Sequence, residues 1–411
     1  MANQLHFQAA SKYGYHSKQQ CRFGSITYDG FSMTPASNRF DRMEWAGAFG
    51  DLGTLVPFVA AYITILKMDP LGILLAFGVS MVACGWFYRT PFPVQPMKAI
   101  GAVAITQAAQ LSTLNGNSVI AASLVTGVIW LLLGVTGMAA KISRLVPREV
   151  MLGIVLGLGM SFMLQGARMM SADWLVACAA FLVVILLKDS KAFPAMFVLL
   201  LGGFAYSIAR DPALLARLGN ISIGFRMPQP DISSLSLNDL FYGAVFLALP
   251  QLPLTLGNAI IGIKEENNRL FPDRKISIKG VATSTGIMNL FSAAIGGIPL
   301  CHGAGGMAAH VSFGARTGGA SIILGSILIA LALAFSGSIE LLFQVFPVAV
   351  LGVILFFAGL LLALANLPGQ SSRQQMFITV ATAGMATWNV AGALALGMLL
   401  HLLARKGRLG T

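Results

Sequence analysis

Two proline-broken stretches interrupt a strongly apolar chain, at residues 93–98 (PVQPMK) and 299–306 (PLCHGAGG). They stand at matching places in the two halves of the chain. Lipid tolerates an interrupted backbone only where the break is buried in protein or lines a cavity. Broken helices at corresponding positions of two halves are a strong sequence pointer to the substrate site of a transporter. The pair therefore favours a membrane fold with two related halves.

The composition supports this interpretation. The 411 residues are 56% hydrophobic and only 10% charged, whereas soluble domains carry roughly 25% charged residues. The net charge of +12 does not indicate a nucleic-acid partner, because the excess lies in short loops and tails, where membrane topology selects Lys and Arg. The four cysteines are scattered without CxxC spacing, so we expect no metal site, no cofactor and no disulfide framework.

Hydropathy predicts an all-α membrane protein with fourteen spans, arranged as a seven-plus-seven inverted repeat with broken third and tenth spans. A span needs about 20 apolar residues, fewer where the helix is broken. A unit with an odd number of spans must invert when it is repeated once. The predicted spans lie near residues 45–66, 70–88, 94–110, 118–139, 150–167, 172–188, 193–209, 239–263, 278–295, 301–312, 318–336, 339–363, 374–388 and 389–404.

The predicted domain organisation has five segments. They are a cytoplasmic N-terminal tail (1–44), the first inverted repeat (45–209), an extracytoplasmic loop (210–238), the second inverted repeat (239–404) and a cytoplasmic C-terminal tail (405–411). With the N-terminus inside, most of the 27 Lys and Arg residues fall on the cytoplasmic side. This bias places both termini in the cytoplasm. We expect an integral, multi-pass protein of the plasma (inner) membrane.

The first broken stretch predicts part of an anion site. Pro93 and Pro96 disfavour helix before them, so a short helix is expected to begin near Pro96 or Met97. A helix start exposes unpaired N–H groups and carries about half a positive charge. Lys98 in the first turn opposes the helix dipole. A lysine at this position is favourable only if an anion binds at the helix start. Gln95 is the expected hydrogen-bond donor beside it.

The second broken stretch repeats this design without the lysine. His302 is a second expected donor, and the run Gly303, Ala304 and Gly305 opens a helix whose N–H groups can approach a ligand closely. Two helix starts together with Lys98 carry roughly two positive charges, which matches a dianion. Each motif alone also fits a plain structural role, as close helix packing, a core histidine or a snorkelling lysine. Their matched positions favour a shared site.

A further pair of matching positions carries polar residues inside apolar spans. Asp51 lies in the first half, and Gln251 and Thr255 lie at the corresponding place of the second. Carboxylates inside spans are costly and usually functional. Asp51 either carries a coupling proton or is a permanent partner of Lys98. Gln251 and Thr255 are uncharged candidates for substrate binding.

These motifs resemble the molybdate transporter family, a branch related to the sulfate permeases. The resemblance covers about residues 44–390 and rests on GDLGT (50–54), PFPVQPMK (91–98), QLPLT (251–255) and PLCHGAGG (299–306). It implies the seven-plus-seven fold shared with nucleobase transporters, in which a core domain carrying the third and tenth spans moves against a gate domain. Nucleobase transporters hold the base with a carboxylate on the eighth span, and QLPLT has no acid there.

The resemblance implies a secondary active transporter that imports molybdate. Importing a dianion against an inside-negative potential is costly, so we expect coupling to protons, with Asp51 or His302 as the proton carrier. Sulfate or another tetrahedral oxyanion, and a passive anion channel on the same fold, remain open as alternatives. A membrane enzyme using Cys301 and His302 as nucleophile and base would need an oriented third group, and none is visible. We therefore expect no enzymatic activity and no catalytic residue. The sequence leaves open whether the protein forms a homodimer.

Overall fold

The computed structural model describes residues 37–411 apart from 65, 99, 102–114, 188–189, 191–192, 220, 222, 229–233, 340, 342–345, 366, 368–371 and 407–411. Most of the predicted N-terminal tail therefore lies outside the described residues. The same holds for the third span beyond Gly101 and for most of the C-terminal tail.

Helices dominate both halves of the chain. The first half contains α1 (Arg42–Ala48), η1 (Phe49–Asp51), α2 (Leu52–Thr64), α3 (Pro70–Tyr88), β1 (Gln95–Pro96), α5 (Gly116–Val135), α6 (Met138–Ser143), α7 (Arg148–Met170), α8 (Trp174–Leu187) and α9 (Ala195–Arg210). The remainder contains α10 (Ala213–Gly219), α11 (Leu237–Tyr242), η3 (Gly243–Ala248), α12 (Leu249–Leu254), η4 (Thr255–Gly262), α13 (Ile263–Leu270), α14 (Ile278–Ala294), β2 (Leu300–Cys301), α15 (Ala304–Ser312), α16 (Gly319–Phe335), η5 (Ser336–Ser338), α18 (Val348–Ala365), α19 (Arg373–Ala386) and α20 (Val390–Arg405).

Each predicted span contains helix in its described part, but the spans predicted at 118–139 and 339–363 are interrupted, and the span predicted at 239–263 is bent by 48°. The span predicted at 118–139 breaks at Gly137, whose φ of +73° ends the helical path before α6. The span predicted at 339–363 breaks at Pro347, because α18 begins only at Val348. Among the described residues, four helices are long and apolar enough to cross a membrane alone, or up to six counting two bent pairs as single spans. The fourteen-span repeat stays a prediction.

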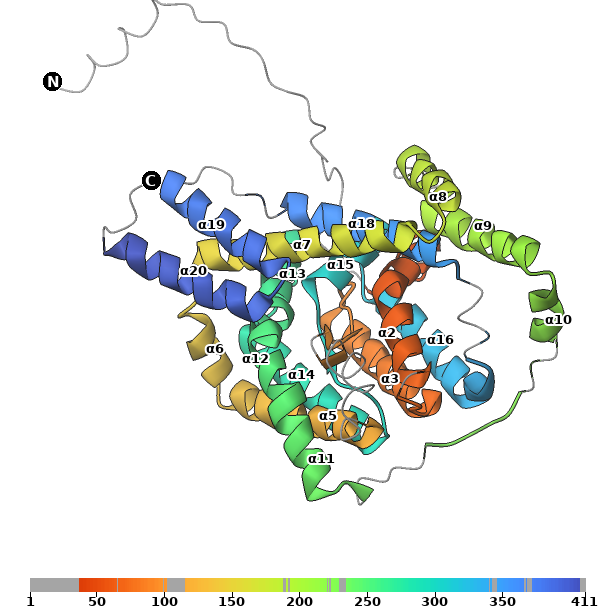
Figure 1. Ribbon diagram of the computed structural model, residues 1–411, viewed down its shortest axis with the longest axis horizontal. Helices are drawn as coiled ribbons and strands as arrows, with labels where there is room; N and C mark the ends of the chain where they lie inside the picture. Colours follow the sequence, from red (N-terminus) through yellow and green to blue (C-terminus); the bar gives the residue numbers. More distant parts are fainter. Residues whose placement is uncertain are drawn as a thin grey trace, which may run out of the picture. The chain divides into compact units, whose positions relative to one another are not determined.

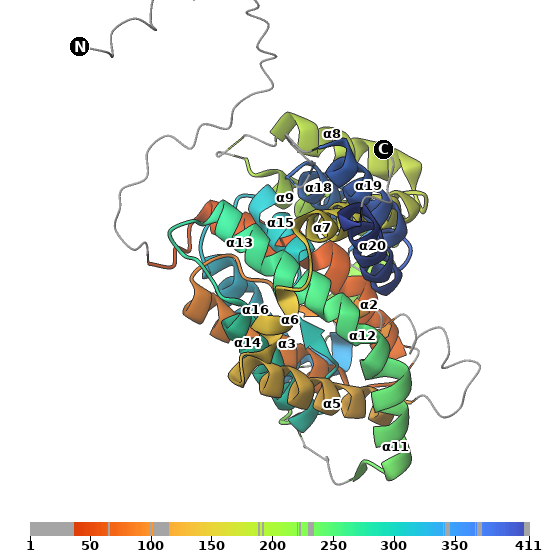
Figure 2. The same ribbon diagram turned by 90° about the vertical axis from the view of Figure 1, so that its left-hand side faces the viewer.

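The helices pack in two groups (Figures 1 and 2). In the core group, α3 packs along α16 and α5 packs along α14, while in the other group, the α7 group, α7 packs along α18 and α19. Glycines permit the closest approaches. A Cβ atom added at Gly325 on α16 would lie 2.6 Å from the carbonyl oxygen of Gly78 on α3, and one at Gly352 on α18 would lie 2.7 Å from that of Gly166 on α7. Small residues of this kind let membrane helices pack backbone against backbone.

The two broken stretches lie side by side within the core group. Gln95 pairs with Cys301 and Pro96 pairs with Leu300 as antiparallel strands, which adds a two-stranded sheet to the predicted all-α class. The Met97 N–H donates to the carbonyl oxygen of Pro299 at 2.9 Å. Helix in the first stretch therefore begins at Lys98, slightly later than predicted. In the second stretch α15 begins at Ala304, close to the predicted start.

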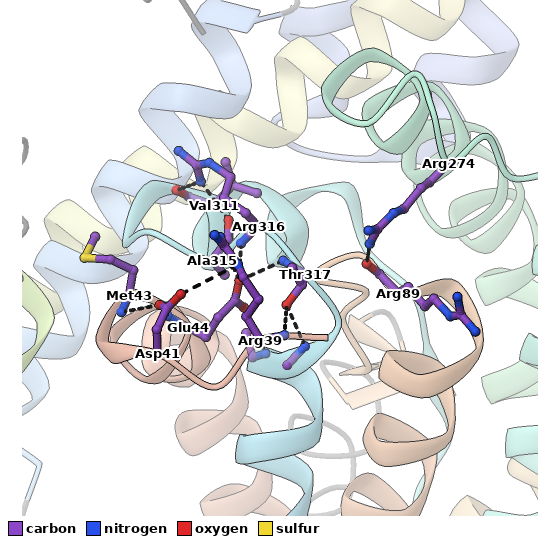
Figure 3. A network of polar contacts seen from close by, with 12 residues as sticks. Arg39, Asp41, Met43, Glu44, Arg89, Arg274, Val311, Ala315, Arg316 and Thr317 are labelled. Atoms are coloured by element: carbon purple, nitrogen blue, oxygen red, sulfur yellow. Dashed lines mark hydrogen bonds and ion pairs between the residues drawn. The ribbon is translucent and has the colours of Figure 1, made fainter. Parts of the chain in front are cut away.

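A buried carboxylate ties α1 to the start of α16 (Figure 3). Glu44 accepts hydrogen bonds from the backbone N–H groups of Arg316 at 2.9 Å, Thr317 at 2.9 Å and Ala320 at 3.1 Å. A negative charge at a helix N-terminus satisfies its unpaired N–H groups and its dipole. The Arg39 guanidinium lies 3.8 Å from the same carboxylate. The loop before α16 is thereby fixed against the first predicted span.

Candidate functional site

Unpaired polar atoms mark the place where the two broken stretches meet. Lys98 Nζ, Asp51 Oδ2 and Gln95 Oε1 are all buried, and within the described part of the chain none of them has a hydrogen-bond partner. The Lys98 residue as a whole is only partly buried, so the burial concerns its charged end. Buried polar atoms in native proteins are nearly always hydrogen-bonded. Three exceptions on neighbouring segments indicate a site that a polar ligand completes.

Asp51 and Gln95 hold each other in place at this site. The Gln95 side-chain amide donates to Asp51 Oδ1 at 2.6 Å and to Thr54 Oγ1 at 3.0 Å. The Thr54 hydroxyl in turn donates to Asp51 Oδ1. Both Gln95 and Asp51 are almost completely buried. This cluster leaves Asp51 Oδ2 and Gln95 Oε1 as its two unfilled acceptors.

The start of α15 faces this cluster without a side-chain cap. Gly303 is the N-cap residue and has no side chain to offer. The N–H groups of Gly306 and Met307 donate to the Gly303 carbonyl oxygen, at 3.0 and 3.2 Å. The N–H groups of Ala304 and Gly305 stand in the first turn, where a helix has no acceptor of its own. They are the donors available to an anion.

Glycine is required here because side chains of the first half press against the helix start. A Cβ atom at Gly303 would overlap Gln95 Oε1, and one at Gly306 would lie 2.9 Å from Asp51 Oδ2 and 2.7 Å from Pro93. Without a Cβ atom, the backbone of α15 can approach the polar cluster closely. The glycine run thus serves close packing between the two halves, at the place where the N–H groups are unpaired.

Phe162 belongs to this site, and sequence reasoning missed it. Lys98 Nζ lies 3.7 Å from the centroid of the Phe162 ring, in cation–π geometry. A Cβ atom at Gly305 would overlap the same ring. Phe162 comes from α7, outside the core group, so the site lies where the two groups of helices meet. An aromatic residue within an apolar span carries no sequence signal of such a contact.

His302 and Met97 lie beside the site with their polar groups occupied. His302 is fully buried, with Nδ1 at 2.9 Å from the Pro93 carbonyl oxygen and Nε2 at 2.8 Å from Ser284 Oγ. The Met97 N–H is committed to Pro299 in the strand pair. In this conformation both residues position the first broken stretch, and neither directs a free donor at the unpaired atoms.

Gln251 supports the helix start of the first stretch. Its Oε1 atom accepts from the Ile100 N–H at 3.3 Å, and its Nε2 atom donates to Thr255 Oγ1 at 3.1 Å. Thr255 is the first residue of η4, a π-helical segment, and is fully buried. π-helical turns inside α-helices are frequent at functional sites. The eighth predicted span thus caps the helix of the third.

The arrangement offers no metal site and no nucleophile–base pair among the described residues. No three or more His, Cys, Asp or Glu side chains in this part of the chain are grouped to hold a metal ion. Cys301 Sγ lies 3.8 Å from the Pro96 carbonyl oxygen, whereas the ring of His302 is bonded to Pro93 and Ser284. Asp51 and Lys98 form no ion pair within 4.0 Å.

Solved structures define the class of protein. The transmembrane domain of the cyanobacterial bicarbonate transporter BicA aligns with a TM-score of 0.54 and 16% identity, over 88% of this chain and 98% of that one. The inward-facing murine anion transporter Slc26a9 aligns with a TM-score of 0.61 and 12% identity, over 91% of this chain and 69% of that one. The chain is an integral, multi-pass membrane protein with several spans, broken helices and the SLC26-like fold.

Sequence comparison then identifies the family. The profile described as "Molybdate transporter of MFS superfamily" matches residues 43–162 and 243–362. Molybdate transporter 2 of Arabidopsis thaliana is 30% identical over 413 residues, covering 88% of this chain and 87% of the relative. Molybdate transporter 1 of Chlamydomonas reinhardtii is 28% identical over 431 residues, covering 78% and 83%. The chain belongs to the molybdate transporter family, as its motifs indicated. It is a family of transporters, so the alternative of a membrane enzyme is wrong.

Proposed function

We propose that this protein is a secondary active transporter that imports molybdate, with protons as the coupling ion. One observation carries the proposal. The buried Lys98 Nζ has no hydrogen-bond partner among the described residues, and it closely follows β1, which pairs with β2, the strand just before the uncapped start of α15. A buried cation near unpaired N–H groups is stabilised best by an anion.

The anion would occupy the space between the two helix starts. Lys98 supplies a full charge, and the N–H groups of Ala304 and Gly305 supply directed donors. Phe162 covers Lys98 in this conformation, and its ring offers only a weak substitute for an anion. Substrate binding would exchange this cation–π contact for a charge-assisted hydrogen bond, which is worth more. Because Phe162 lies on α7, the exchange would couple binding to movement between the two helix groups.

The named substrates of the relatives favour molybdate among tetrahedral dianions. Three relatives carry the name molybdate transporter. Roughly two positive charges from Lys98 and two helix starts suit a dianion. Sulfate has the same charge and shape, so the geometry alone does not separate the two oxyanions.

Proton coupling has an electrostatic reason and a candidate residue. Importing a dianion against an inside-negative potential costs about 2.3 kcal/mol per charge per 100 mV. Co-transport of two or more protons removes that cost. Asp51 is the candidate carrier, because its Oδ2 atom is buried beside the site and has no donor among the described residues. His302 is a weaker candidate, since both of its ring nitrogens are engaged.

Packing supports the seven-plus-seven inverted repeat. In such a repeat each span corresponds to the span seven places later. The second and eleventh predicted spans, α3 and α16, pack together, and so do their counterparts, α14 and α5. The fifth and twelfth, α7 and α18, are counterparts of each other and also pack together. The family profile matches once in each half, which also favours duplication.

Loop positions support the predicted topology with both termini in the cytoplasm. Arg89 and Arg274, from two loops assigned to the inside, meet through a hydrogen bond from the Arg274 guanidinium to the Arg89 carbonyl oxygen (Figure 3). Arg274 is also within electrostatic reach of Arg39 and Glu44. Thiol labelling from outside the cell should reach Ser234→Cys and miss Ser277→Cys, and the reverse pattern would overturn the topology.

Reconstituted uptake tests the proposed function. Proteoliposomes containing the protein should accumulate molybdate when the pH gradient is inward. Competition with sulfate then ranks the two oxyanions. Uptake that follows voltage but ignores the pH gradient would identify a passive channel, and absence of any oxyanion flux in folded protein would reject the proposal.

A further inference from the structure

A second cluster of positive charge lies far from the site described above. A cavity of about 760 Å³ is lined by Lys67, Arg217, Arg226 and Asp69. Arg226 is paired with Asp69, and Arg217 is paired with Asp211. Ile63, near the end of α2, also lines it. Asp51 directly precedes the other end of this helix, roughly 18 Å away at 1.5 Å per residue. The cavity is therefore separate from the paired helix starts.

The basic residues of this cavity are unusual for their predicted side of the membrane. The charge pattern leaves five Lys and Arg residues outside, namely Lys67, Arg168, Arg210, Arg217 and Arg226. Topology selects against basic residues there. Three of the five nevertheless line one cavity, although they come from two loops far apart in the sequence. Such convergence favours a role for the charge itself.

The cavity wall is held by backbone contacts. The N–H groups of Gly224 and Arg226 each donate at 3.0 Å to carbonyl oxygens at the end of α16, those of Ala334 and Leu333. The Arg226 guanidinium pairs with Asp69 at 2.7 Å. These contacts fix the Arg226–Asp69 pair, so the cavity wall beside Lys67 is preorganised.

Lys67 is the cation of this cavity whose charge is not offset. In the described part of the chain it forms no hydrogen bond or ion pair. Its φ of +55° is in the left-handed region, and the following N–H of Met68 donates back to the Tyr62 carbonyl oxygen at 3.3 Å. This is a helix C-terminal turn in which glycine is the usual residue. A lysine held in glycine's conformation points to a use for its side chain.

We propose that this cavity is an outer capture site for tetrahedral divalent oxyanions, which concentrates substrate before it reaches the paired helix starts. The role in import rests on the proposed function, and the side of the membrane rests on the predicted topology. Because the two arginines are paired with carboxylates, the excess positive charge of the cavity comes from Lys67. An excess of one charge in a cleft focuses the field and raises the local concentration and arrival rate of counter-ions. Capture of this kind changes the rate of loading and leaves the final binding site intact.

Thiol labelling tests the cavity without relying on transport. In a Cys21→Ser, Cys178→Ser background, Ser338→Cys places a thiol in the cavity wall. An anionic thiosulfonate reagent should react faster than a cationic one of similar size. Lys67→Gly should lower this rate ratio several-fold, because the removed charge acts oppositely on the two reagents. Glycine suits the positive φ of position 67, so the Lys67→Gly variant should fold like the parent protein.

Matched variants and ligands complete the labelling experiment. Lys67→Arg should restore the ratio, and Arg168→Gln, which removes an outer charge away from the cavity, should leave it unchanged. Molybdate and sulfate should each slow labelling of Ser338→Cys. An unchanged ratio in Lys67→Gly, or equal effects of Lys67→Gly and Arg168→Gln, would overturn the capture site.

Uptake kinetics separate this inference from the proposed function. At low ionic strength Lys67→Gly should raise the apparent KM for molybdate several-fold with the maximal rate unchanged, and high salt should remove the difference. If the parent protein transports no oxyanion, the proposed function fails while labelling still decides the cavity. If the parent transports molybdate and Lys67→Gly has the same KM at low salt, the capture role is wrong.

Discussion

The two broken spans differ in the chemical groups that they present at their helix starts. The first brings a full charge at Lys98 and has its helix start supported by the side chain of Gln251. The second brings no charge, and Gly303 leaves the start of α15 without a side-chain cap. In the proposed site, one half would supply attraction and the other would supply backbone donors at close range. A single anion would then use different groups from the two matching motifs.

Removing the charge of the first span should have the largest effect. A charge-assisted hydrogen bond is worth about 1.5–3 kcal/mol, so Lys98→Ala should weaken molybdate binding roughly ten- to a hundredfold. Lys98→Arg should recover only part of the loss, because a planar fork is not a compact ammonium. Equilibrium binding to the purified, monodisperse protein measures both variants.

A further substitution at Lys98 distinguishes a binding lysine from a structural one. Lys98 Nζ has no hydrogen-bond partner among the described residues, so Lys98→Met should leave the thermal midpoint of the substrate-free protein unchanged or raise it. A structural partner of Asp51 would instead lower that midpoint when removed. Parent-like affinity in Lys98→Ala would reject the electrostatic site.

Crowding the helix start of the second broken span should have the second-largest effect on binding. A Cβ atom at Gly305 would overlap the ring of Phe162, so Gly305→Ala should cost about 1–3 kcal/mol of stability and weaken binding about tenfold. Gly384→Ala on α19 is the matched control, because nothing lies within 4 Å of its added Cβ atom. A Phe162→Leu background should reduce the penalty of Gly305→Ala but not change the control. Additive effects would mean that Phe162 and Gly305 are not coupled.

Asp51→Asn should abolish proton coupling, and it should change molybdate affinity less than the substitutions of Lys98 and Gly305 do. Asparagine can still accept at Oδ1 from Thr54 and Gln95, so the cluster should be preserved. Loss of a nearby negative charge should leave molybdate binding as tight as in the parent or slightly tighter. Uptake should no longer respond to the inward proton gradient. Retained gradient dependence in proteoliposomes would assign the proton to another group.

Some features of this fold could be predicted because they depend on local chemistry. Asp69 and Pro70 form an N-cap and first turn, and α3 spans the predicted residues 70–88. Proline and glycine placed the start of α15 within one residue. These signals depend on residues within one helical turn of each other, so they can be recognised in a single sequence.

Other features depend on partners distant in the sequence and could not be predicted. The ring of Phe162 reaches Lys98 from another helix group, and hydropathy reports only that Phe162 is apolar. His302 carried a plausible donor role, but its nitrogens are taken by Pro93 and Ser284. The apolar run at 339–363 predicts one continuous span, whereas α18 begins only after Pro347. Motif positions indicated the candidate site, and packing decided which of its described atoms lack a hydrogen-bond partner.

Removing the Gln251 side chain, which caps the helix of the first broken span, should have the smallest effect. Gln251→Leu removes the acceptor of the Ile100 N–H and the donor to Thr255, at a cost of about 0.5–1.5 kcal/mol of stability. Because Lys98 keeps its charge, affinity should fall no more than about threefold, which corresponds to less than 1 kcal/mol. Thermal unfolding and equilibrium binding measure the two quantities. Gln251→Glu keeps the acceptor but adds a negative charge, so it should weaken binding more than Gln251→Leu does. If Gln251→Leu instead matches Lys98→Ala in lost affinity, Gln251 contacts the anion directly, and the two spans share the polar contacts more evenly than proposed.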